Sequence, residues 1–206
     1  MNHRAPAAIA AALFAVGLAA CGSSGRPHSS SSSANAQGGQ PSGAAALTAE
    51  AQSAATGDIP DNQVFLNYHD ARGGYAVKFP EGWARRGTGA DVTFSEKNNL
   101  IHIVVAPGAA PTVVSMRAEL ARVRASTPSL SFTSPAPVRL GSGPAIRATY
   151  TTLGAPNPVT GKKVQLLVDR YELARGGRRA TVDLGTARGV DNVDAYRMII
   201  NSFRWR

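Results

Sequence analysis

Residues 164–184 read VQLLVDRYELARGGRRATVDL, and this stretch decides the expected fold. Residues 164–173 form the longest strand candidate of the chain. The Gly176-Gly177 pair that follows suits a tight hairpin turn. Beyond the turn, Ala180, Val182 and Leu184 alternate with other residues and share one face, as in a half-buried strand. Two strands joined by so short a turn run antiparallel, which indicates an antiparallel sheet.

Apolar runs bounded by turn residues predict further strands on both sides of this hairpin. They lie at residues 64–68, 75–79, 92–95, 100–105, 130–132, 138–140 and 145–150. The run 100–105 is apolar at nearly every position, which is typical of a central strand covered on both faces.

Two helices complete the predicted elements. The first has an apolar stripe and ends before Pro128, because the residue preceding proline avoids the α region. Its stripe consists of Val113, Met116, Leu120 and Val123. The second helix covers residues 192–203, with Asp191 as the expected N-cap. Its stripe consists of Val193, Tyr196, Ile200 and Phe203. The order of four strands, a helix, four strands and a helix lacks βαβ alternation, so we expect an α+β fold: an antiparallel β-sheet with about two helices packed on it.

The N-terminal segment has the layout of a secretory signal, with His3 and Arg4 before an uncharged apolar run over residues 5–20. The run ends in Leu18, Ala19, Ala20 and Cys21, and Cys21 is the only cysteine. This ending resembles the lipobox of bacterial lipoproteins. The resemblance implies cleavage before Cys21 and acylation of its thiol with diacylglycerol and fatty chains such as palmitate. The alternative, an incidental thiol after a membrane helix, fits poorly because the run is shorter than the roughly 20 residues of a span.

These features divide the chain into three parts: a signal peptide at residues 1–20, a flexible tether at residues 21–60 and a folded domain at residues 61–206. The tether is rich in serine, glycine and alanine and offers too little apolar surface to fold. Its stretch 44–55 is rich in alanine and could form a transient helix, but it has no apolar stripe and stays in the tether. We therefore expect a lipid-anchored protein on the extracytoplasmic face of the cell membrane.

The predicted domain is basic. Residues 62–206 hold 20 Lys or Arg and 10 Asp or Glu, a balance of +10. The groups Arg85/Arg86 and Arg117/Arg124 are candidates for contact with an anionic lipid or glycan, and a merely solvated surface is the alternative. Trp83 beside them is a candidate binding aromatic, or else caps the edge of the core. Nucleic acid is not expected, because no stacking-aromatic motif accompanies the charge.

Residues 74–83, GYAVKFPEGW, resemble the opening of PsbP-like domains, where a strand runs into a Pro-x-Gly-Trp turn. The end of the chain also resembles these domains. It has a hairpin at residues 171–182, then a short helix, and closes with NSFRW at 201–205. The resemblance covers about residues 64–205 and implies a Mog1/PsbP-like sandwich. It also implies a binding or assembly role, since the family shares no catalytic residue to carry over.

Catalytic, metal-binding and cofactor-binding patterns are absent from the sequence. The domain has two histidines, His69 in a predicted turn and His102 in the apolar run, and lacks nucleophile or zinc motifs. We therefore expect a non-catalytic binding module for an envelope partner. One alternative is a lipid or glycolipid carrier with an apolar cavity between the sheet and its helices. The other is an enzyme whose cleft gathers His69 with distant Asp and Ser side chains.

Overall fold

The structure is a computed structural model that describes residues 43–156 and 161–206. Within these ranges the helices are α1 (Gly43–Thr56), α2 (Val113–Ser126) and α3 (Val193–Ser202). The strands are β1 (Phe65–Asp70), β2 (Tyr75–Pro80), β3 (Ala84–Thr88), β4 (Asp91–Glu96), β5 (Asn99–Pro107), β6 (Ser131–Phe132), β7 (Ala136–Leu140), β8 (Gly143–Leu153), β9 (Gln165–Arg175), β10 (Arg178–Ala187) and β11 (Arg204–Trp205).

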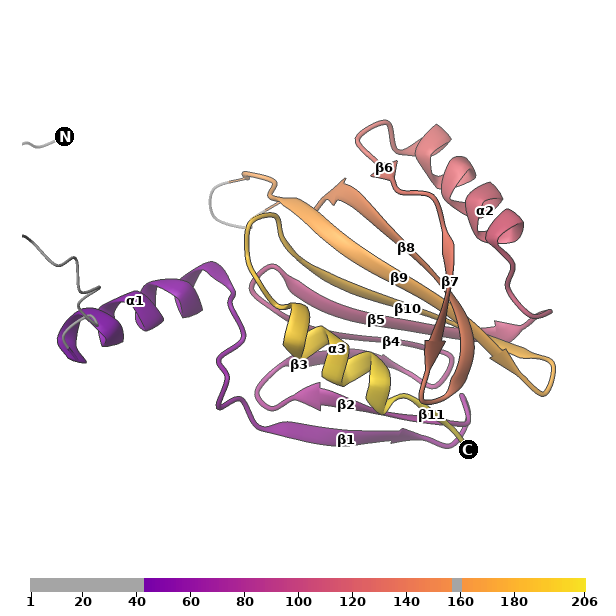
Figure 1. Ribbon diagram of the computed structural model, residues 1–206, viewed down its shortest axis with the longest axis horizontal. Coiled ribbons are helices and arrows are strands. Elements are labelled where there is room, and N and C mark those ends of the chain that lie inside the picture. The colour runs from indigo at the N-terminus through magenta and orange to yellow at the C-terminus, as the bar shows by residue number, and fades with distance from the viewer. Residues whose placement is uncertain (1–42, 157–160) are drawn as a thin grey trace, which may run out of the picture. The chain divides into compact units, whose positions relative to one another are not determined.

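The predicted hairpin is confirmed as β9 and β10, and it forms the middle of the larger sheet (Figure 1). Eight strands pair in this sheet, in the order β3-β4-β5-β10-β9-β8-β6, with β7 also on β8. Three more strands form a small sheet in the order β1-β2-β11. Every pairing is antiparallel, so the α+β class with antiparallel sheets is confirmed.

The main core lies between one face of the eight-stranded sheet and a layer made of α3 and the small sheet (Figure 1). Alternation along β5 and β10 directs Ile103 and Val182 to this face, and both are fully buried. From the other layer, Tyr75 of β2 stacks on Phe203 with ring centroids 5.4 Å apart. The C-terminal segment thereby closes the core over the hairpin.

A second, smaller core lies on the opposite face, where α2 covers β8. Met116 and Leu120 of α2 pack against Ile146 and Ala148, which alternate away from the main core. The helix is capped locally, because the Thr112 side chain accepts from Ser115 N and the Ser115 side chain accepts from Thr112 N. α2 is thus a self-contained helix held by a small apolar contact.

The structure differs locally from the predicted elements, and one local prediction was wrong. β5 is central but not covered on both faces, since Leu100, His102 and Val104 are only half-buried. No strand was predicted at β3, because none of its residues is buried and an exposed edge strand needs no apolar alternation. The helix left open for residues 44–55 is present as α1, and its described side chains are all exposed, which is why it shows no stripe.

The expected cap and stripe of the last helix also need correction. Asn192, not Asp191, is the N-cap, although Asp191 Oδ1 accepts from Val193 N at 3.2 Å. Val193 is 59% exposed and Ile199 takes its place in the core. In α2, Val123 lies at the exposed edge of the predicted stripe. None of the helices in the described ranges combines the length and the apolar character needed to cross a bilayer.

Candidate binding pocket

A buried hydrogen-bond network fixes the chain where it enters the domain. Asn192 Oδ1 accepts from Ile59 N at 2.8 Å, and Asn192 Nδ2 donates to Gly57 O at 3.1 Å. The same amide nitrogen lies 3.1 Å from Asn99 Oδ1 and 3.0 Å from Thr186 Oγ1. Each buried polar group left without a partner would cost about 1–3 kcal/mol, so these contacts hold residues 57–59 against the start of α3.

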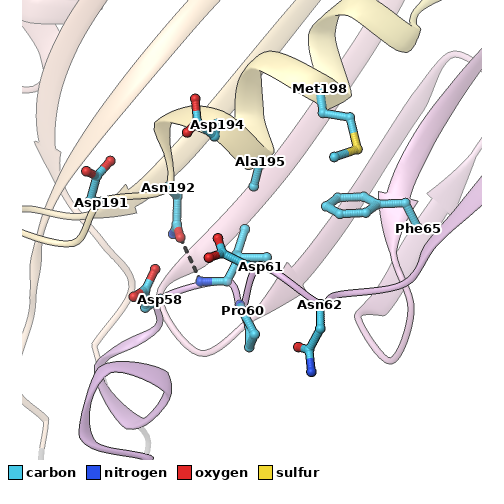
Figure 2. A pocket seen from close by; sticks show the side chains of 11 residues that line it. Asp58, Pro60, Asp61, Asn62, Phe65, Asp191, Asn192, Asp194, Ala195 and Met198 are labelled. Atoms are coloured by element: carbon cyan, nitrogen blue, oxygen red, sulfur yellow. Dashed lines mark hydrogen bonds between the residues drawn. The ribbon is translucent and has the colours of Figure 1, made fainter. Parts of the chain in front are cut away.

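A surface pocket of about 740 Å³ lies between this entering segment and the first turns of α3. Figure 2 shows carboxylates on both walls, and the Phe65 ring and the Met198 side chain pointing toward one another. The lining residues are Asp58, Ile59, Pro60, Asp61, Asn62, Phe65, Asp191, Asn192, Asp194, Ala195 and Met198. The pocket thus combines a ring of negative charge with an apolar patch.

The charge of the pocket opposes the charge of the chain, which carries a formal +9. Asp191 and Asp194 stand at the N-terminus of α3, where the helix dipole stabilises carboxylates. Asp194 also pairs with Arg197 on the exposed side, with Nη1 and Oδ1 3.0 Å apart. Several carboxylates in one concavity disfavour an anion and favour a cationic group. Met198, 45% exposed, offers apolar contact to the aliphatic stem of such a group.

The structure does not bring the four candidate arginines together. Arg85 and Arg86 lie on β3 at one edge of the large sheet, whereas Arg117 and Arg124 lie on α2, over β8 near the opposite edge (Figure 1). All four are exposed. The guanidinium of Arg85 stands 5.5 Å from the Tyr68 ring centroid, and that of Arg124 5.6 Å from the Phe132 ring centroid. They form two separate basic patches rather than one basic face.

Trp83 is 9% exposed and belongs to the main core, so little of its indole faces solvent. This placement matches the alternative that Trp83 caps the edge of the core. The residues predicted for signal cleavage and lipidation, Leu18, Ala19, Ala20 and Cys21, lie outside the described residues.

The two domain histidines have separate surroundings. His69 lines a second surface pocket of about 720 Å³ together with Asp70, Tyr75, Arg178 and Arg206, and no serine is among its lining residues. The Asp70 carboxylate serves the backbone instead, accepting from Gly73 N and Gly89 N. His102 Nε2 lies 2.9 Å from Asp91 Oδ1 on the neighbouring strand β4. Within the described ranges, no group of three or more His, Cys, Asp or Glu side chains is arranged to hold a metal.

Side chains fill the space where a carrier would need its cavity. Ile199 and Ile200 of α3 and Phe203 just after it are at most 2% exposed and belong to one core cluster with fully buried residues of the large sheet. On the α2 side, Met116 and Leu120 are buried to the same degree. This packing counts against the lipid-carrier alternative.

This pocket was not predicted from the sequence, for an identifiable reason. Asp58 and Asp61 lie at the predicted boundary between tether and domain, and Asp191 was interpreted only as a helix N-cap. The pocket forms because the Asn192 side chain joins two segments 133 residues apart. A signal was present: four aspartates flanking both segments of a basic chain.

Neither the family models nor the curated proteins give a match to this chain. Several solved structures do match it. The solution structure of cyanobacterial PsbP (CyanoP) from Synechocystis sp. PCC 6803 is 17% identical, with a TM-score of 0.53 over 73% of this chain and 98% of that one.

Two further structures are more distant. The Saccharomyces cerevisiae Ran-binding protein Mog1p is 8% identical, with a TM-score of 0.44 over 69% of this chain and 95% of that one. LpqN, involved in cell envelope biogenesis of Mycobacterium tuberculosis, is 12% identical, with a TM-score of 0.41 over 70% of this chain and 91% of that one. The similarity to CyanoP confirms the fold that the GYAVKFPEGW stretch suggested: this chain carries a PsbP-like α+β domain.

Proposed function

We propose that this chain is a non-catalytic binding module of the cell envelope, anchored through acylated Cys21, and that its partner is a protein held in the pocket between residues 58–65 and α3. The observation that carries the proposal is the pocket itself. It occupies about 740 Å³, and its two walls are joined by the buried Asn192 network. A concave surface with fixed walls and convergent polar groups is the usual form of a recognition site.

The chemistry of the lining selects the kind of partner. Carboxylates on both walls attract a basic side chain, while Phe65 and Met198 receive an apolar stem. A protein segment that presents lysine or arginine meets both demands. An anionic lipid or glycan does not fit here, and its contacts would fall to the separate patches at Arg85/Arg86 and Arg117/Arg124.

Site-specific photo-crosslinking in the native host tests the proposal. A photoreactive residue at Asn62, an exposed rim position, is expected to capture a protein, whereas the same residue at exposed Arg175, at the end of β9 and outside the pocket lining, is not. Combining the Asn62 probe with Asp61→Asn and Asp194→Asn should reduce the captured band at least tenfold. The corresponding control combines the probe with Glu81→Gln and Glu96→Gln.

Two outcomes would overturn the proposal. One is equal capture from Asn62 and Arg175. The other is an Asn62 adduct that does not change when the two aspartates are neutralised. Capture of lipid or glycan from probes at Arg86 or Arg117, with none at Asn62, would select the anionic-surface alternative instead.

A further inference from the structure

A carboxyl group is buried without a hydrogen-bond donor beneath α2. Glu172 of β9 is 0% exposed, and no donor hydrogen-bonds to either of its carboxyl oxygens, although the Glu119 carboxyl is near enough to share a proton with it. Its side chain leaves β9 on the face opposite the main core, next to Ile146 of β8 and Thr181 of β10. This is the face that α2 covers. A buried carboxylate left unpaired is costly, so its charge state matters to whatever covers it.

The charged groups around Glu172 come from all the packed elements. α2 contributes Glu119, and β10 contributes Arg179, whose Nη1 lies 2.8 Å from Glu119 Oε1 but 3.9 Å from Glu172 Oε2. Arg170 of β9 is committed elsewhere, because it donates to both oxygens of Asp183 at 2.8 and 2.6 Å. Tyr150 of β8 also donates to Asp183, at 3.2 Å.

These contacts leave one cation for two carboxylates. Arg170 and Asp183 neutralise one another, and Arg179 is engaged mainly by Glu119. With Glu172 and Glu119 both ionised, the group under α2 has a net negative charge, and one proton on the pair restores neutrality. Burial, followed by the charge of Glu119, raises the pKa of Glu172 to about 7, although Arg179 and Arg170 act in the opposite direction.

Apart from the ion pair of Glu119 with Arg179, α2 has few buried contacts with the sheet. Met116 and Leu120 are its two buried side chains, while Val114 is 77% and Val123 39% exposed. The helix caps its own N-terminus, so it can leave the sheet without losing that cap. Elements with few buried contacts open locally at a free energy below that of global unfolding.

We propose that α2 is a pH-sensitive flap, docked on the sheet while Glu172 and Glu119 share a proton and released when both carboxyls ionise. Release uncovers the apolar surface formed by Met116, Leu120, Ile146 and Ala148. In the docked state Glu172 keeps its proton to higher pH than in the open state, because in the open state its pKa returns toward the ordinary 4.5. Docking therefore weakens as the pH rises from about 4.5 to about 7, and stays weak above that range. The inference is independent of the pocket at α3.

Hydrogen–deuterium exchange on the full chain tests it. After correction for intrinsic exchange rates, protection of the α2 amides is expected to fall at least tenfold between pH 5.5 and 8.5, relative to β10 amides in the same sample. Glu172→Gln, which stays neutral, should remove this dependence and keep α2 protected at pH 8.5. Glu119→Gln should weaken it, because it relieves the repulsion from the α2 side. Glu81→Gln, a neutralised exposed carboxylate, should behave as wild type.

An equal change of α2 protection in wild type and Glu172→Gln would overturn the proposal. A fall that appears equally in α2 and β10 would also overturn it, since it reports global rather than local opening. If Glu172→Gln does not fold, the Glu119→Gln comparison decides alone: a dependence as steep as in wild type rejects the flap.

Discussion

At the residue scale, Asp70 joins two turns that are far apart in the chain. Its carboxylate accepts from Gly73 N at 2.5 Å, from Gly89 N at 2.7 Å and from the Tyr68 hydroxyl at 2.9 Å. The β1–β2 turn is thereby tied to the β3–β4 turn. Burial opposes ionisation, but these hydrogen bonds together lower the pKa of Asp70 below its ordinary 3.8.

We expect Asp70→Ala to lower the free energy of unfolding at pH 7 by about 2–3 kcal/mol, because hydrogen bonds to a charged acceptor are lost. A carboxyl with a depressed pKa stabilises the fold above its unfolded-state pKa and loses that effect as pH falls through the folded value. The gap between wild type and variant should therefore shrink below pH 4. Urea unfolding at pH 7 and pH 3 measures this. Asp194→Asn, with a carboxylate 91% exposed, is the control and should change stability by less than about 0.5 kcal/mol.

At the element scale, the β9–β10 hairpin depends on the backbone of its turn. Gly176 and Gly177 have φ of 57° and 74°, and an added Cβ at either would meet no atom within 4 Å. We expect Gly177→Ala to cost about 1 kcal/mol through backbone conformation alone. Gly177→Asn should cost less, because asparagine tolerates left-handed backbone. Thermal unfolding of both variants checks this, and equal losses would contradict the backbone explanation.

The same hairpin explains what could be predicted from the sequence. Apolar spacing and glycine turns predict β5, β9, β10 and α3, because each of these elements has a buried face. β3 has no buried residue, so no periodicity marks it. Asn192 also escaped prediction, because its role depends on contacts to residues about 90 and 130 positions away. In the sequence Glu172 is one polar residue of a strand, and nothing in its spacing indicates that it is fully buried.

Across the whole molecule, Asp70 and Glu172 have opposite effects on stability as the pH changes. The stabilisation from Asp70 is lost in acid, whereas ionisation of Glu172 weakens the contact of α2 with the sheet as the pH approaches 7. The docked, fully stabilised domain therefore belongs to mildly acidic conditions. The pocket at α3 lies on a different face from α2, so ligand capture there and flap release are separable.

Where both features act depends on the proposed lipid anchor, and Cys21 is the residue on which that proposal rests. Residues 5–20 hold no charge and end in Leu18, Ala19 and Ala20 directly before Cys21, an order that resembles the lipobox. We expect Cys21→Ala to abolish incorporation of labelled palmitate in the native host and to leave the protein uncleaved or in the soluble fraction. Two or more acyl chains hold a protein firmly on a bilayer, so the wild type should stay with membranes through a high-salt wash.

High salt separates the anchor from electrostatic adhesion. The basic domain could bind anionic lipid by charge alone, but that attraction is screened over about 3 Å in 1 M salt. Arg85→Ala combined with Arg86→Ala is the matched control, because it lowers the charge and leaves Cys21 intact. It should stay on the membrane, whereas Cys21→Ala should not. Cys21→Ala protein that is still cut at the usual position and resists the wash would contradict the anchor and move the membrane contact to the domain surface.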